Sequence, residues 1–247
     1  MEAHPLANLR DAYFRRRHTS LLVAIVVAMG VRPLIGDGGA GPTLFSVALL
    51  LLLVIVLTTF QVEELVGDRD ALLTQRRRRR IIAWALAVPA ILERVYALIS
   101  PSSEMLLFGS LTWFAFLAFV TWSQLRNLLR HKEITGETIS MSISIYLLLG
   151  LTWGFLYLVI YQLHPDAFHF DRQVGALTAE NEPYILPTLV YFSLTTISTV
   201  GFGDITPVTL SARYAAVTEA ITGQFYLAIL VARLVGMQMT RSGPERA

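Results

Sequence analysis

A run of six residues, Thr199 to Asp204, has the composition of a site for dehydrated cations. It reads TVGFGD and follows the Thr/Ser-rich stretch Leu194 to Ser198. A dehydrated cation needs oxygen ligands in place of its water shell, and stacked rings of backbone carbonyls can supply them. Carbonyls that point inward from consecutive residues require backbone angles that side chains oppose, and glycine relieves that strain. The alternate glycines, Gly201 and Gly203, have the spacing that this geometry needs.

The residues of this run have separate expected roles. The hydroxyl and carbonyl of Thr199 would form the innermost ring of ligands, and Asp204 would anchor the loop at its outer mouth and attract cations. A plain glycine turn between two membrane helices is the alternative, but it explains neither residue. The expected ligands are Thr199, Val200, Gly201, Phe202 and Gly203, and the expected supporting residues are Thr195, Thr196, Ser198, Asp204 and Glu219.

The chain that must position this loop is strongly apolar. Hydrophobic residues make up 54% of it, and its mean hydropathy is +0.56. Apolar runs near bilayer length recur along the chain. A shorter stretch at about 184–197 predicts a re-entrant helix, because irregular backbone at membrane depth survives only where it is buried in protein or lines water. The composition therefore predicts an all-α membrane protein with six spans, at about 19–35, 43–61, 81–100, 104–125, 139–163 and 208–237.

Basic residues predict the orientation of these spans. Arginines 15–17 precede the first span, the run Arg76 to Arg80 precedes the third, and Arg126 and Arg130 follow the fourth. All of them fall on one side if six spans alternate, and the positive-inside rule makes that side cytoplasmic. We therefore expect a multi-pass protein of the cell membrane with both termini in the cytoplasm. The run Arg76, Arg77, Arg78, Arg79 and Arg80 could instead bind anionic lipid.

The C-terminal half resembles the pore module of tetrameric potassium channels, of the prokaryotic six-span type. The resemblance rests on the TVGFGD loop and on the order span, short helix, loop and span over residues 133–247. It implies a potassium-selective channel that conducts passively, with potassium ions at Thr199 to Gly203 and no other cofactor. Each chain carries one such loop and a four-fold ring needs four, so the resemblance implies a homotetramer. Phe202 departs from the commoner tyrosine, although the family accepts either.

The last span carries further candidates. A carboxylate at membrane depth is costly, so we expect Glu219 to face protein behind the short helix, with Thr195 or Thr196 as a neighbour. Gly223 lies near mid-span, where a bend or close helix packing would each use a glycine. Residues at helical spacing on the following turns share one face, which we expect to line an inner cavity. These are Leu227 or Ala228, Val231 and Val235.

Residues 1–132 have the four spans of a voltage-sensing domain without its charges. Each arginine of such a sensor gains about 2.3 kcal/mol per 100 mV when it crosses the field. The fourth span has no arginine between Glu104 and Val120. We therefore expect only weak voltage dependence. Glu93 and Arg94 in the third span are expected to form a neutralised pair near the outer interface.

Three alternatives remain beside a potassium channel. A weakly selective cation channel is the nearest, because small changes in such a loop can remove discrimination between ions. A potassium transporter subunit derived from channels would carry several degenerate loops in one long chain, and this chain has one intact G-F-G. A membrane enzyme would need a polar cluster on facing helices, which the expected spans lack. With no cysteines in the chain, disulfides and thiolate metal sites are excluded.

Overall fold

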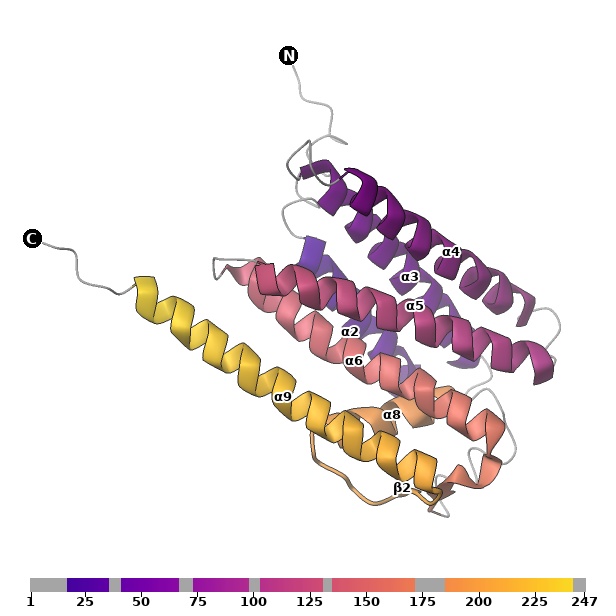
Figure 1. The fold of residues 1–247 in the computed structure, drawn as a ribbon. Helices are drawn as coiled ribbons and strands as arrows, with labels where there is room; N and C mark the ends of the chain where they lie inside the picture. The colour runs from indigo at the N-terminus through magenta and orange to yellow at the C-terminus, as the bar shows by residue number, and fades with distance from the viewer. Residues whose placement is uncertain are drawn as a thin grey trace, which may run out of the picture.

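A computed structural model describes residues 17–35, 41–66, 73–97, 103–130, 135–171 and 185–241. The described chain is a bundle of long helices (Figure 1). A one-turn 3-10 helix, η1 (Pro165–Ala167), and two short strands, β1 (Phe168–Phe170) and β2 (Ile205–Pro207), lie at one end of the bundle. The helices are α2 (Arg17–Ile35), α3 (Gly41–Val66), α4 (Leu73–Ala97), α5 (Ser103–Arg130), α6 (Gly136–Leu163), α8 (Ile185–Ile197) and α9 (Leu210–Arg241).

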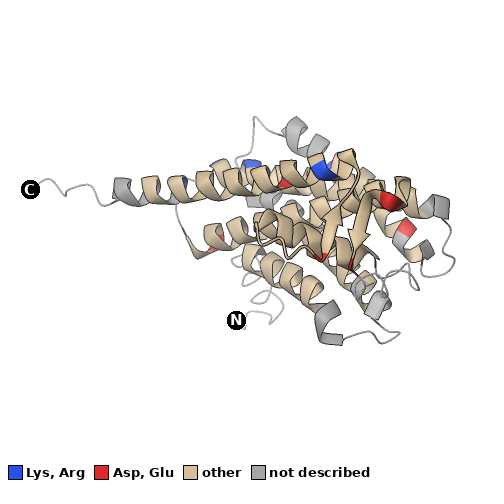
Figure 2. Ribbon diagram, turned by 90° about the horizontal axis from the view of Figure 1, so that it is seen from below, with Lys and Arg blue, Asp and Glu red and all other residues tan. Residues whose placement is uncertain are grey.

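Each expected span falls on one of these helices, and the expected re-entrant stretch falls on α8. Three described segments are long and apolar enough to cross a membrane, and they lie in α5, α6 and α9. Shorter apolar segments lie in α2, α3 and α8. Among the residues coloured by charge in Figure 2, few are charged, although α4 carries the run Arg76 to Arg80 near its start. A helical membrane protein is therefore supported, while the count of six spans stays a prediction.

Helix α6 lies at the centre of the bundle and packs against α2, α5, α8 and α9. Its contact with α5 combines apolar and polar pairs. The rings of Trp113 and Phe155 stack with their centroids 5.5 Å apart, and Ser110 Oγ donates to Gln162 Oε1 at 2.5 Å. The boundary expected at residue 132 falls between α5 and α6, just outside the described residues, so the division into two domains stays a prediction.

The start of α6 also holds the start of α2. The Glu137 carboxylate accepts hydrogen bonds from the His18 amide at 3.0 Å and from Thr19 Oγ1 at 2.7 Å. The first amides of a helix have no partner within the helix and favour negative charge. Glu137 therefore supplies a cap to α2 from another helix and joins the first helix to the C-terminal half of the chain.

The sequence did not predict the small sheet. Strands β1 and β2 pair antiparallel, with His169 opposite Thr206. The pairing continues beyond the strands, because the Asp171 amide donates to the Asp204 carbonyl at 2.8 Å and the Val208 amide donates to the Ala167 carbonyl at 2.8 Å. The segment after the TVGFGD loop is thus held to the segment that follows α6.

Candidate functional site

The loop after α8 alternates in backbone conformation. Thr199, Gly201 and Gly203 have positive φ angles of 59°, 53° and 84°, and Val200 and Phe202 between them do not. Alternation between left- and right-handed residues turns successive peptide groups to the same side of a chain. The two glycines were expected in this role. The left-handed Thr199 was not, because a β-branched residue rarely adopts positive φ.

The loop begins on the last carbonyls of α8. The amides of Val200 and Gly201 both donate to the Thr195 carbonyl, at 2.9 and 3.1 Å, and the Thr199 amide donates to the Thr196 carbonyl at 3.0 Å. The last carbonyls of a helix carry partial negative charge and attract cations. Thr195 and Thr196 therefore support the loop through their backbones, while both hydroxyls donate to the Phe192 carbonyl.

The loop faces open space in the single chain. The Val200 side chain is 54% exposed and that of Phe202 is 71% exposed. A Cβ atom added at Gly201 or Gly203 would meet no heavy atom within 4 Å. The need for glycine here therefore comes from the φ angle, not from crowding within the chain.

Asp204 closes the outer end of the loop. Its Oδ2 accepts a hydrogen bond from Tyr191 OH of α8 at 2.8 Å, and its Oδ1 accepts from the Ile205 amide at 3.1 Å. The Tyr191 ring also stacks on Phe202, with centroids 6.4 Å apart and planes 2° apart. Asp204 thus joins the end of the loop to α8, its role at the mouth of the loop stays a prediction, and Tyr191 is a functional candidate that the sequence analysis missed.

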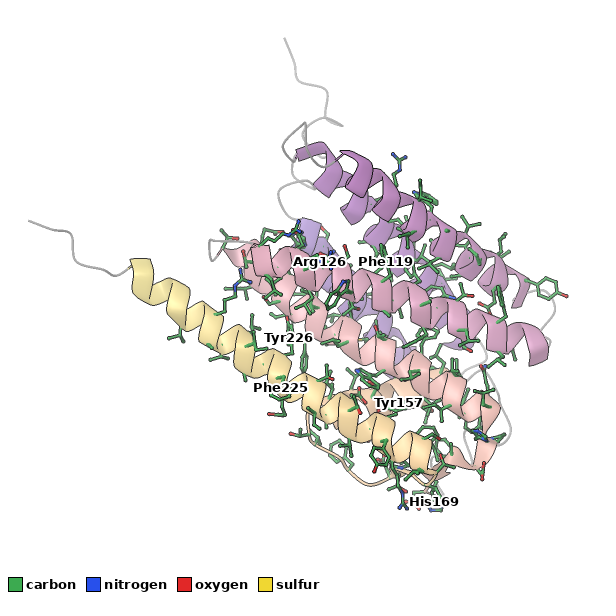
Figure 3. The ribbon with its side chains drawn as sticks, in the orientation of Figure 1. Phe119, Arg126, Tyr157, His169, Phe225 and Tyr226 are labelled. Atoms are coloured by element: carbon green, nitrogen blue, oxygen red, sulfur yellow. The ribbon has the colours of Figure 1, made fainter. Side chains whose placement is uncertain are left out.

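Glu219 lies behind α8 with no exposed surface. Its carboxyl group hydrogen-bonds the hydroxyls of Tyr157 and Ser193. Tyr157 lies where α6 passes α8 and α9 (Figure 3). Glu219 thus contacts α8 through Ser193, and its hydrogen-bond partners are not the expected Thr195 or Thr196. Spacing along α8 could not show that Ser193, and not Thr195 or Thr196, faces α9.

Gly223 lies directly against the end of α8. A Cβ atom added there would be 2.5 Å from Ile197 Cγ1 and 2.7 Å from the Ile197 carbonyl oxygen. The same carbonyl accepts a hydrogen bond from Tyr146 OH of α6 at 3.1 Å. Of the two interpretations of this glycine, the structure supports close packing, and a hinge at Gly223 stays a prediction.

The expected cavity face of α9 is open in the single chain. Leu227, Ala228, Val231 and Val235 are all exposed. Such exposure suits a cavity wall, a subunit contact or a lipid contact, so their assignment stays a prediction. Arg213, in the first turn of α9, donates from Nε to the Pro207 carbonyl at 3.2 Å.

Two charged features of α4 are partly described. Glu93 is buried, and its carboxyl carbon lies 2.2 Å from the position of a Cβ atom added at Gly109 of α5. The Arg94 side chain lies outside the described residues, and so do the side chains of Arg76 to Arg79. Arg80 stands at one end of a shallow groove of about 670 Å³ lined by Arg80, Ile81, Trp84, Ala85, Val88 and Pro89.

Among the described residues, no group of three or more His, Cys, Asp or Glu side chains could hold a metal ion. The candidate site is therefore the loop itself, with α8, α9 and β2 around it. A comparison with protein families gives a match over this part of the chain. Residues 143–239 match the family model described as Ion channel.

The matched range begins in α6 and ends in α9, so it contains α8, the TVGFGD loop and β2. Comparisons with curated proteins and with solved structures gave no match. The family match supports an ion channel domain in the C-terminal half of the chain. Families of this kind are generally not enzymatic.

Proposed function

We propose that this chain is the subunit of a potassium-selective channel that conducts passively across the cell membrane as a homotetramer. The observation that carries the proposal is the alternation of positive φ at Thr199, Gly201 and Gly203 directly after the end of α8. Potassium ions would be held by backbone oxygens from Thr199 to Gly203 and by the Thr199 hydroxyl. We call this loop the filter from here on.

Two features favour a cation in the filter. Oxygen ligands replace the water shell of a potassium ion. They offset the free-energy cost of dehydration when the ion enters the filter. The C-terminal end of α8 lies at the inner end of the filter, and its partial negative charge favours a cation there. One chain supplies one strand of ligands, and its exposed filter needs three more copies to surround an ion.

The proposed topology has six spans, with α8 re-entrant and both termini cytoplasmic. In Figure 1, the C-terminal ends of α5 and α9 and the start of α6 lie at the end of the bundle away from α8 and β2. Arg126, Arg130 and Arg233 also belong to that end, where the positive-inside rule expects basic residues. The filter would then open to the outside.

A weakly selective cation channel is the second candidate. It is favoured by the outer filter, where Phe202 has no hydroxyl and contacts α8 through its stack on Tyr191. A tyrosine at this position could add a hydrogen bond, and such a bond contributes about 1 kcal/mol. A less firmly held ring would let the filter adapt to smaller cations.

Reversal potentials separate the two candidates. The purified protein is reconstituted in planar bilayers with excess potassium on one side and excess sodium on the other, and both ions are present on each side. A selective channel gives a reversal potential close to the potassium equilibrium potential, which follows the potassium gradient and stays unchanged when the sodium concentration is varied. A reversal potential near zero under these ionic conditions would favour the weakly selective channel, and absence of any cation current would refute both.

We also propose that the segment Arg76 to Arg80 binds an anionic phospholipid of the cytoplasmic leaflet. Five adjacent arginines complement a lipid phosphate, and the groove beyond Arg80 is apolar enough for an acyl chain. Native mass spectrometry with phosphatidylglycerol or phosphatidylcholine tests this. Preferential retention of phosphatidylglycerol, lost when the five arginines become glutamine but kept in Arg126→Gln, supports the site. Equal retention of both lipids would refute it.

A further inference from the structure

Glu219 joins three helices at one buried point. Its Oε2 contacts Tyr157 OH of α6, and its Oε1 contacts Ser193 Oγ of α8. Ser193 Oγ also lies 2.7 Å from the Gly150 carbonyl oxygen of α6. Glu219, Tyr157 and Ser193 have no exposed surface. This buried cluster, which we call the carboxyl node, lies where α8 meets α6 and α9.

Close backbone approach makes the node possible. A Cβ atom added at Gly150 would be 2.8 Å from Leu194 Cδ2, and one added at Gly154 would be 2.7 Å from Val190 Cγ2 and 3.0 Å from its Cα. The two glycines, four residues apart on α6, form the small-residue pattern that lets membrane helices pack closely. This packing brings α8 near enough for Ser193 to reach a backbone carbonyl of α6.

The contacts of the node require more protons than its hydroxyls carry. A serine or tyrosine hydroxyl has one hydrogen to donate, and a carbonyl oxygen can only accept. Three contacts are present, one at Tyr157 and two at Ser193, but the two hydroxyls supply only two protons. If Ser193 donates to Gly150, the contact between Ser193 and Glu219 needs a proton from the carboxyl group.

The burial of Glu219 also indicates that its carboxyl group carries a proton. An ionised carboxylate in an apolar interior is costly unless a cation or several donors balance it. The described groups that hydrogen-bond the Glu219 carboxyl are hydroxyls, and none carries positive charge. Titratable side chains that the packed helices bring to this region are Tyr146 and Tyr157 of α6, while Tyr191 of α8 is bonded to Asp204. All three are neutral at physiological pH.

We propose that Glu219 is an uncharged carboxylic acid that donates to Ser193, accepts from Tyr157 and thereby holds α9 against the back of α8. Glu219 is a positioning residue for the filter. The chain from Ser193 to Thr199 is short and helical up to Ile197, so a displacement of Ser193 also displaces the start of the filter. The inference extends the proposed channel function, but the state of Glu219 can be measured without ion conduction.

Infrared difference spectroscopy gives the direct test. The protein is purified in detergent at neutral pH, and the spectrum of Glu219→Gln is subtracted from that of the wild type. We expect a positive carbonyl band of a protonated carboxylic acid, shifted to lower frequency in D₂O. Glu137→Gln is the matched control, because Glu137 caps a helix as a carboxylate and its difference spectrum should show carboxylate bands. Carboxylate bands for Glu219 would overturn the proposal.

A set of substitutions tests the positioning role. Glutamine can donate from its amide and accept at its carbonyl, so Glu219→Gln should leave the melting temperature unchanged. The same variant should keep the potassium-over-sodium permeability ratio within about twofold of the wild type. Glu219→Ala should lower the melting temperature by roughly 5 °C or more and reduce the permeability ratio. Equal loss in Gln and Ala variants would mean that a charged carboxylate is needed and would overturn the proposal.

The outcomes separate this inference from the proposed function. If the wild type passes no selective potassium current but shows the protonated band and the tolerance of glutamine, the channel assignment fails and the neutral node stands. If the wild type is potassium-selective but shows carboxylate bands, the channel assignment stands and the proposed uncharged state of Glu219 is wrong.

Discussion

Thr199 holds a left-handed backbone angle that would be costly elsewhere in the chain. Its φ of 59° occurs in a β-branched residue, and strain of this kind costs on the order of 1–3 kcal/mol. The amides of Thr199, Val200 and Gly201 are tied to carbonyls at the end of α8, which offsets that cost. A threonine under such strain is consistent with the proposed use of its hydroxyl and carbonyl as ligands at the inner end of the filter.

At the residue scale, we predict that Gly201→Ala or Gly203→Ala abolishes selective potassium conduction. An alanine with positive φ costs roughly 1–2 kcal/mol, and the backbone can relieve it by turning a carbonyl away from the ion path. Reversal potentials in mixed potassium and sodium measure the effect. Gly136→Ala is the matched control, because Gly136 starts α6 and a Cβ there also meets no atom within 4 Å. Unchanged selectivity in the filter variants would refute the assignment of the loop.

At the element scale, α9 and the end of α8 form one packed unit around the Ile197 carbonyl. Tyr146 from α6 donates to this carbonyl, and Gly223 from α9 leaves no room for a side chain beside it. The Tyr146 ring stacks with Tyr226 of α9, whose hydroxyl donates to the Ser142 carbonyl at 2.7 Å. We therefore expect a movement of α9 at this level to displace Ile197, which lies two residues before the filter.

We predict that Gly223→Ala destabilises the protein and changes the open probability of the channel. The added methyl group would overlap Ile197, and overpacking of this kind costs about 1–3 kcal/mol. Melting temperature in detergent and single-channel open probability measure the two effects. Gly236→Ala lies further along α9, where a Cβ meets nothing within 4 Å, and it should leave both unchanged. Equal behaviour of the two variants would show that Gly223 serves as neither a packing site nor a hinge.

The sequence predicted those elements that leave a local signal. Long apolar runs located the helices, and the alternate glycines of TVGFGD located the loop. It missed β1 and β2 because three-residue strands such as Phe168–Phe170 have too little periodicity, and their pairing joins distant segments. It missed Ser193 and Tyr157 as partners of Glu219 because the rotation of one helix against another depends on packing. The pair Gly150 and Gly154 was visible in the sequence as a small-residue pattern and could have indicated the close contact of α6 with α8.

At the scale of the whole molecule, α9 presents an apolar face that the single chain leaves uncovered. Among the described elements, α9 packs mainly against α6, α8 and β2, and its Arg233 bonds the Leu128 carbonyl of α5. A wide exposed apolar face on the last helix of the matched domain suits contact with further copies of this chain. Its exposed members include Leu210, Tyr214, Val217, Ile221, Phe225 and Ile229.

We predict a complex of four chains, each of 27.5 kDa. Light scattering of the detergent-purified protein, corrected for bound detergent, gives the mass. Phe225→Ala should weaken the complex because it removes contact area on α9. Leu92→Ala on α4 is the matched control, since both side chains are 64% exposed in the single chain. A stable, conducting monomer or dimer would contradict the proposed filter, because one or two chains cannot surround an ion.

The distribution of charge along α5 predicts how the whole channel responds to voltage. No arginine lies between Glu104 and Val120, and the first one, Arg126, has its guanidinium 5.4 Å from the centroid of the Trp122 ring near the end of the helix. Arg130 ends the helix, and the guanidinium of Arg233 bonds the Leu128 carbonyl, which ties α9 to this end of α5. Long basic side chains at a helix end reach interfacial water by extending their apolar stems.

Steep voltage gating moves several charges through the field, each worth about 2.3 kcal/mol per 100 mV. Arginines already near cytoplasmic water would cross little of that field, whatever movement α5 makes. We therefore predict an open probability that changes only weakly with voltage, and mainly through ion occupancy of the filter. Macroscopic currents recorded over a wide voltage range at several potassium concentrations test this. A Boltzmann slope equal to several charges per channel, unchanged by potassium concentration, would mean that the first four helices move charge by a route that α5 does not provide.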